Sequence, residues 1–123
     1  MNASSQIPAL GSLEQQVMHL LWDHGDLMIR EIIDYLPGNP AYTTIATVLR
    51  HLAGKGMVVV IKDGRFARHA AKMSREHYTA ELMDQALSAS RNREASILHF
   101  VDNMEDQDRE LLRQYLHDQE QQQ

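Results

Sequence analysis

The stretch Ala41-Tyr-Thr-Thr-Ile-Ala-Thr-Val-Leu-Arg-His-Leu-Ala-Gly-Lys-Gly56 decides the fold of this chain. Its large apolar residues follow the i, i+3, i+4, i+7 spacing of one helix face: Ile45, Val48, Leu49 and Leu52. Pro40 and two threonines supply a start signal, and the glycines at 54 and 56 supply a stop. The spacing predicts an amphipathic helix over residues 43–52.

The opposite face of this helix carries short or hydrogen-bonding side chains and no acid: Tyr42, Thr43, Ala46, Thr47 and Arg50. A helix that lies in the major groove of DNA needs such a face, because bulky or acidic groups would clash or repel phosphates. We therefore predict that this helix contacts DNA. The alternative is an ordinary solvated surface on which Thr43 or Thr44 serves mainly as a helix cap.

A basic hairpin is predicted directly after the helix, with strands at 57–62 and 65–70 around an Asp63-Gly64 turn. A helix followed by such a hairpin is typical of the second half of a winged helix-turn-helix. Residues 43–72 hold six basic residues and one acidic residue. Phosphate contacts are predicted for the wing residues Lys62, Arg65 and Arg68, although each of them alone could equally be a solvated strand-edge charge.

The first half of the motif is predicted upstream of these elements. Ser12, followed by Gln15, resembles a capping box at the start of a first helix. A short extended link at Leu27-Met28 is expected to pair with the wing. A second helix is predicted at 29–36, and Pro37-Gly38-Asn39-Pro40 ends it.

Three short amphipathic helices are predicted downstream, the first capped by Ser74 and the last beginning at Asp106 or Asp108. No separate core is apparent for them, and a large apolar side chain that stays exposed forgoes about 1.5–3 kcal/mol. We therefore predict a homodimer through this region, because a second copy can cover the apolar stripes. The predicted contacts, which could instead form an intramolecular core, are Tyr78, Leu82, Leu98, Val101, Leu112, Tyr115 and Leu116.

Charge is distributed unevenly along the 123 residues, whose net charge is −5. Residues 1–72 hold seven basic and six acidic residues, whereas residues 73–123 hold five basic and eleven acidic residues. An acidic C-terminal region lowers the overall affinity for phosphate but leaves a local basic face able to bind it. We predict a mainly α fold with a small β-hairpin wing, divided into a flexible N-terminus (1–11), a winged-helix DNA-binding domain (12–72), a helical dimerisation region (73–120) and a flexible tail (121–123).

Several classes of function find no support in the sequence. No apolar run approaches the length of a membrane span, and the first twelve residues lack the features of a secretory signal, so a cytoplasmic protein is expected. The absence of cysteine excludes thiolate metal sites and disulfides. We find no catalytic motif and expect neither an enzyme nor a cofactor. A zinc site needs three or four converging ligands, and here His69 and His77 would have to meet an acid such as Glu81. We therefore predict no metal site.

The chain resembles the penicillinase repressor family, which includes regulators of β-lactamase, methicillin-resistance and copper-transport operons. The resemblance covers about residues 9–118 and is carried by Leu13-Glu-Gln-Gln-Val-Met-His-Leu-Leu-Trp22, Tyr42-Thr-Thr-Ile-Ala-Thr-Val-Leu-Arg-His-Leu52, Lys55-Gly56 and the helices around 97–101. It implies a dimeric repressor on an operator with two-fold symmetry. By position, Thr43, Thr44 and Thr47 match family residues that face the major groove, and Arg50 and His51 match polar or basic positions.

The resemblance also implies ways of releasing the repressor from DNA. In the β-lactam branch, a protease cuts the C-terminal region at an Asn-Phe bond, and the matching pair here is His99-Phe100. This chain has the phenylalanine of that bond but a histidine in place of the asparagine. The copper branch senses metal through a C-terminal cysteine cluster, which this chain lacks. The expected partners are therefore operator DNA, a second copy of the chain and an inactivating protease.

The sequence is also consistent with two other interpretations. Winged helices also serve as protein-interaction modules without specific DNA binding, in which case the acidic C-terminal half would be the working surface. A sensor could also bind a small ligand between the wing and the dimerisation helices. The basic excess in residues 43–72 favours the DNA-binding interpretation, because an interaction module has no need of it.

Overall fold

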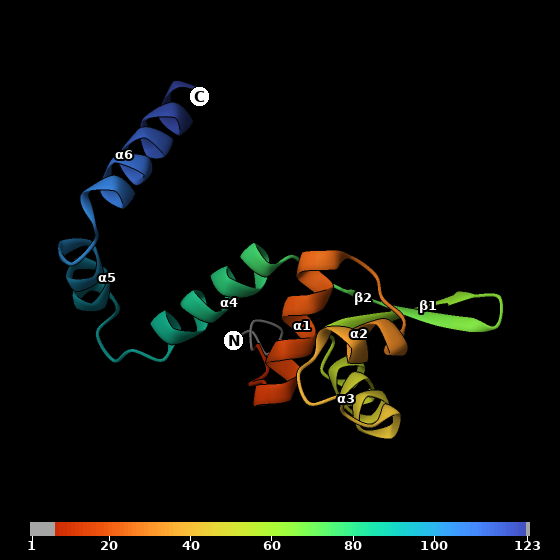
Figure 1. Ribbon diagram of the computed structural model, residues 1–123. Helices are drawn as coiled ribbons and strands as arrows, with labels where there is room; N and C mark the ends of the chain where they lie inside the picture. The colour runs from red at the N-terminus through yellow and green to blue at the C-terminus, as the bar shows by residue number, and fades with distance from the viewer. Residues whose placement is uncertain (1–6, 123) are drawn as a thin grey trace. The chain divides into compact units, whose positions relative to one another are not determined.

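The computed structural model describes residues 7–122, which form six helices and one β-hairpin (Figure 1). The chain divides into two compact units, one extending through Leu82 and the other beginning at Met83. The first unit therefore continues past residue 72, where the predicted DNA-binding domain ends. Within the described range, no helix is both long and apolar enough to cross a membrane.

Helix α1 (Ser12–His24) has Gly11 as its N-cap, so the predicted capping box at Ser12 is wrong by one residue. The Glu14 carboxylate accepts a hydrogen bond from the Gly11 backbone N–H at 2.8 Å. Glycine offers no side chain to return the bond, so only half of the reciprocal pattern forms. Glu14, and not Gln15, lies at the third helical position. From there its carboxylate can accept the backbone N–H of the N-cap residue.

The segment before α1 contacts the first unit, although a flexible N-terminus was predicted for residues 1–11. Leu10 packs against the core, and the Ala9 carbonyl accepts a hydrogen bond from Lys55 Nζ at 3.0 Å. Residues 1–6 lie outside the described residues. At the other end, α6 (Asp106–Gln121) continues into the predicted tail, and residue 123 again lies outside the described range.

Helix α2 (Ile29–Tyr35) is short because the chain turns immediately after it. Gly38 and Asn39 both adopt positive φ angles, of 77° and 47°, which no helix can continue through. Before the helix, Leu27 forms the predicted bridge to the wing, exchanging backbone hydrogen bonds of 2.8 and 2.9 Å with His69. The wing is thereby fastened to the helical part of the unit.

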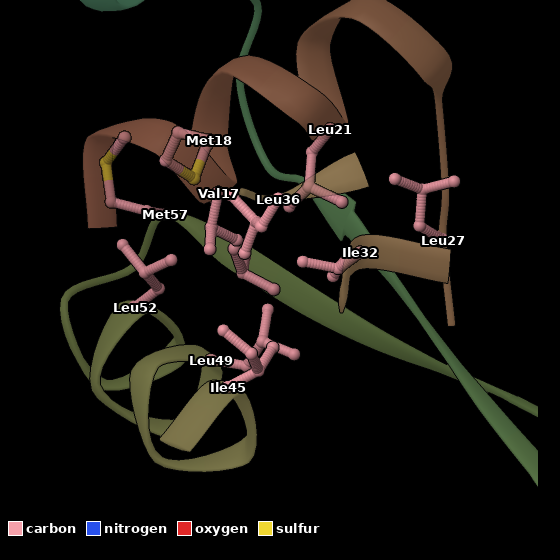
Figure 2. Packing of buried hydrophobic residues seen from close by; sticks show 11 residues of the cluster. Val17, Met18, Leu21, Leu27, Ile32, Leu36, Ile45, Leu49, Leu52 and Met57 are labelled. Carbon is pink, nitrogen blue, oxygen red and sulfur yellow. The ribbon is translucent and has the colours of Figure 1, made fainter. Parts of the chain in front are cut away.

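Helix α3 (Tyr42–Gly54) buries the apolar face that the sequence predicts, with Ile45, Leu49 and Leu52 at most 3% exposed and Val48 partly buried. These side chains meet apolar residues of α1 and α2, and Figure 2 shows the resulting cluster. Burying each such side chain contributes about 1.5–3 kcal/mol. The core therefore fixes which face of α3 stays outside.

The wing consists of β1 (Val58–Asp63) and β2 (Phe66–Ala71), an antiparallel pair in which Val60 lies opposite His69. The turn residues are Gly64 and Arg65, so the predicted Asp63-Gly64 turn is wrong by one residue. Gly64 adopts a φ of 63° at the first turn position, which glycine allows without strain.

The first turns of helix α4 (Arg75–Ser88) belong to the first unit. Ser74 caps this helix as predicted, accepting the backbone N–H of His77 at 3.0 Å. The Trp22 indole N–H donates to the Met73 carbonyl at 2.9 Å, and the Trp22 and Tyr78 rings lie 5.6 Å apart. These contacts explain why the first unit reaches beyond residue 72.

The second unit contains the end of α4, helix α5 (Arg93–Asp102) and helix α6. Asn92 caps α5 through its side chain, which accepts the Ala95 backbone N–H at 3.0 Å. No described residue from 83 to 122 is buried. The unit therefore lacks a core of its own, although helices of this length are marginal in water without tertiary packing.

The ion pair between Glu14 and Lys55 should make the stability of the first unit depend on pH. The two groups are 2.7 Å apart, and Glu14 is 9% exposed. The hydrogen bond from Lys55, followed by that from Gly11, lowers the pKa of Glu14 from its ordinary value of 4.5. A carboxyl with a lowered folded-state pKa stabilises the fold above pH 4.5, and this stabilisation is lost as pH falls through the folded-state pKa.

We therefore expect Glu14→Gln to lower the free energy of unfolding by about 1 kcal/mol near pH 6 and by less near pH 3.5. Urea unfolding at the two pH values measures the difference. The matched control is Glu110→Gln, which removes a carboxylate from an exposed ion pair with Arg113 on α6 and should leave the unfolding of the first unit unchanged. An equal loss for Glu14→Gln at both pH values would contradict the assigned role.

Candidate nucleic-acid interface

The outer face of α3 presents the residues that the sequence selects for DNA contact. Tyr42, Thr43, Thr44, Arg50 and His51 are exposed, and Thr47 is half-buried. The N-cap is Ala41, and no side chain forms a cap hydrogen bond there. Neither threonine is therefore used to cap the helix, which leaves their hydroxyls available to an outside partner.

The three predicted wing residues differ in their surroundings. Lys62 and Arg65 are exposed near the tip, and within the described range neither lies in an ion pair. Arg68 donates to the Asp26 carbonyl at 2.8 Å and lies 3.4 and 3.5 Å from the carboxylates of Asp26 and Glu31. Arg68 thus fastens the wing to the region around α2, and its phosphate contact stays a prediction.

Basic residues of the first unit fall into two groups by their partners. Three of them are held by acids of the same chain: Lys55 by Glu14, Arg68 by Asp26 and Glu31, and Arg75 by Asp23. Five form no ion pair with any described residue: Arg30, Arg50, Lys62, Arg65 and Lys72. The second group includes a residue that the sequence analysis missed, Arg30 on α2. The sequence feature that could have identified Arg30 is its position on the polar side of a helix whose isoleucines face the core.

His69 lies on β2 and is only 7% exposed. Burial lowers its pKa, so the imidazole is neutral at physiological pH and adds no charge to the interface. His77 lies 3.3 Å from Glu81 on α4. Among the described residues, no group of three or more His, Cys, Asp or Glu side chains could hold a metal ion.

The residues predicted for dimerisation lie in both units. Tyr78 packs beside Trp22 and against the core of its own chain, and Leu82 is 39% exposed. The others lie on α5 and α6: Leu98, Val101, Leu112, Tyr115 and Leu116. Four of these five are 39–60% exposed, a high fraction for large apolar side chains.

The His99-Phe100 bond lies inside α5. The carbonyl of this bond accepts hydrogen bonds from the Asn103 backbone N–H at 3.2 Å and from Asn103 Nδ2 at 3.0 Å. Both residues are exposed. A protease that cuts an extended substrate could reach this bond only after α5 unwinds locally.

Three helices, a hairpin wing and an acid-free outer face on the third helix define the class of winged-helix DNA-binding proteins. Comparisons with known proteins agree. A family model described as the penicillinase repressor matches residues 10–118. The transcriptional regulator BlaI of Mycobacterium tuberculosis is 35% identical over 118 residues, covering 91% of this chain and 86% of that protein. The chain belongs to the penicillinase repressor family.

Two solved structures support the same fold. The solution structure of the DNA-binding domain of the repressor BlaI is 28% identical with a TM-score of 0.51, covering 57% of this chain and 88% of the other. An ArsR-like regulator from Rhodococcus sp. RHA1 shares the fold at 22% identity and a TM-score of 0.54, covering 76% and 86%. The protein is thus a DNA-binding transcriptional repressor, and the family confirms the expectation that it is not an enzyme.

Proposed function

We propose that the protein is a homodimeric, cytoplasmic repressor that binds a two-fold symmetric operator of a β-lactamase-type or related operon. Helix α3 enters the major groove through Tyr42, Thr43, Thr44, Thr47, Arg50 and His51, and the wing contacts the DNA backbone. The observation that carries this proposal is the set of unpaired basic side chains in the unit that bears the acid-free face of α3. Cations without an acidic partner in their own chain are available to phosphates.

Dimerisation through α5 and α6 is part of the same proposal. No described residue of the second unit is buried, and an apolar groove of about 600 Å³ runs along Leu87, Ile97, Phe100, Val101 and Leu112. A second copy would cover this surface and place two α3 helices on one operator, so that operator symmetry mirrors protein symmetry. Release by an inactivating protease at His99-Phe100 would additionally require α5 to open.

The test of specific binding is fluorescence anisotropy with a duplex from immediately upstream of the protein's own gene, beside a scrambled duplex, at two salt concentrations. We expect discrimination of about a thousandfold or more. Weak, equal and salt-dependent binding to both duplexes would place the operator elsewhere. Absence of binding at low salt would reject the repressor function and favour a protein-interaction module.

Thr47→Ala should relax base preference, because this residue is proposed to meet base edges, where a well-made contact contributes about 1–3 kcal/mol of discrimination. The ratio of affinities for native and scrambled duplexes should fall about five-fold or more, with little change for the scrambled duplex. Thr79→Ala, the same change on α4, is the matched control and should leave the ratio unchanged. An unchanged ratio for Thr47→Ala would remove this residue from the reading surface.

A further inference from the structure

A groove of about 510 Å³ lies between the start of α2, the start of α3 and the tip of the wing. Arg30 lines it from α2, Tyr42 from α3, and Arg65 and Phe66 from the wing, with His69 also lining it. All of these residues belong to the first unit. The groove therefore joins the two elements proposed to contact DNA to a third, α2, which the sequence analysis did not include.

The groove carries positive charge that no acid balances. Two guanidinium groups line it, and none of its lining residues is acidic. The acid next to Arg30 in the chain, Glu31, is already engaged, since it accepts the Met28 backbone N–H at 2.8 Å and lies 3.5 Å from Arg68. A ligand of this groove should therefore be an anion.

The neutral residues of the groove narrow the chemistry of that anion. Phe66 is 64% exposed and Tyr42 is 55% exposed, so an apolar ring and a phenol lie beside the two arginines. A free phosphate ion would leave the phenyl ring in water. A nucleic-acid backbone presents phosphate oxygens to the arginines and apolar sugar surface to the ring. A phosphodiester strand can engage the two arginines and the phenyl ring at the same time.

We propose that this groove seats one strand of the DNA backbone, with Arg30 and Arg65 contacting phosphates and Arg30 serving as a positioning residue for α3. The inference rests on the proposed function and extends it to α2. Because backbone contacts fix the register and orientation of a protein on the duplex, a strand held between α2 and the wing would set how α3 enters the major groove.

The experiment measures the dependence of binding on salt for the full-length protein with Arg30→Gln, using the native and scrambled duplexes. Loss of one phosphate contact should make the plot of log affinity against log salt less steep by about 0.9, and by a similar amount on both duplexes. Arg30→Lys keeps the charge and should keep the slope. Arg91→Gln, which removes the same charge from the second unit, should also keep it.

A second measurement locates the contact on the DNA. Neutral methylphosphonate groups are placed singly along the backbone, and each duplex is titrated with the native protein and with Arg30→Gln. At the phosphate that Arg30 contacts, the two changes should be non-additive, since each removes the same interaction. Thermal unfolding of the variant checks that Arg30, which is exposed and without an ion pair to any described residue, leaves the fold intact.

The outcomes separate this inference from the proposed function. Native protein that binds DNA, together with an Arg30→Gln variant of unchanged slope and additive methylphosphonate effects, would overturn the inference alone. Native protein that binds neither duplex would overturn both. A reduced slope with one non-additive position would support the groove as a backbone site.

Discussion

Replacing Leu52 with alanine is expected to lower the free energy of unfolding of the first unit by about 2–5 kcal/mol. Leu52 is fully buried near the end of α3, in the cluster shown in Figure 2. Removing its branched end forfeits the transfer free energy of those atoms and leaves a cavity that the helices fill only in part. Because the total free energy of unfolding of a domain is only about 5–15 kcal/mol, this loss should bring the variant close to unfolding at physiological temperature.

Thermal and urea unfolding followed by circular dichroism measure this loss. The matched control is Leu52→Met, which nearly conserves volume and should cost less than about 1.5 kcal/mol. DNA binding by the alanine variant should fall with the folded fraction and recover at low temperature, since Leu52 does not lie on the outer face. A loss below about 1 kcal/mol for Leu52→Ala would mean that α3 is not held by this core.

The helices could be predicted from the sequence because the periodicity of their apolar residues is strong. The face formed by Ile45, Leu49 and Leu52 is buried, and the short strand at Leu27 does pair with the wing at His69. The pairing at Leu27 is long-range and is expected from the winged-helix pattern, whereas the burial of the α3 face depends on neighbouring residues in the chain and on the need to cover one apolar face. Local sequence contains both kinds of information.

The register of the wing could not be predicted in the same way. The predicted turn would pair Val60 with Ala67, whereas the structure pairs it with His69. A shift of two residues leaves every side chain on the same face of the hairpin, so the apolar alternation fits both registers equally. The bridge between Leu27 and His69 supports the observed register, and it joins segments far apart in the chain.

The cations of the candidate interface also depend on contacts between segments that are far apart in the chain. Sequence alone counts Arg68 among the wing cations and omits Arg30, because charge counting does not reveal partners. Arg68 meets Asp26 and Glu31 only once the chain has folded, while Arg30 keeps no ion pair among the described residues. Which cations remain available to DNA is therefore a property of the tertiary structure.

Leu112→Asp is expected to convert the protein to a monomer and to weaken binding to a complete operator by about a hundredfold or more. Leu112 is 39% exposed on α6 and lines the apolar groove of the second unit with Ile97 and Phe100. A carboxylate at this position would have to be desolvated between two chains, which costs several kcal/mol. Without the dimer, the second half-site is no longer bound at a high effective concentration, and that advantage is worth about 10²–10⁴ in affinity.

Sedimentation velocity measures the oligomeric state, and anisotropy compares a complete operator with a single half-site. Half-site affinity should be the same for the native protein and Leu112→Asp, because α3 and the wing are untouched. Gln107→Asp, which adds the same charge to an exposed polar position of α6, should stay dimeric. A Leu112→Asp protein that remains dimeric would place the interface elsewhere, whereas a monomeric native protein with equal affinity for both duplexes would reject dimerisation itself. Since residues 83–122 contain no buried side chain, an interface elsewhere would leave these helices without a buried core to stabilise them.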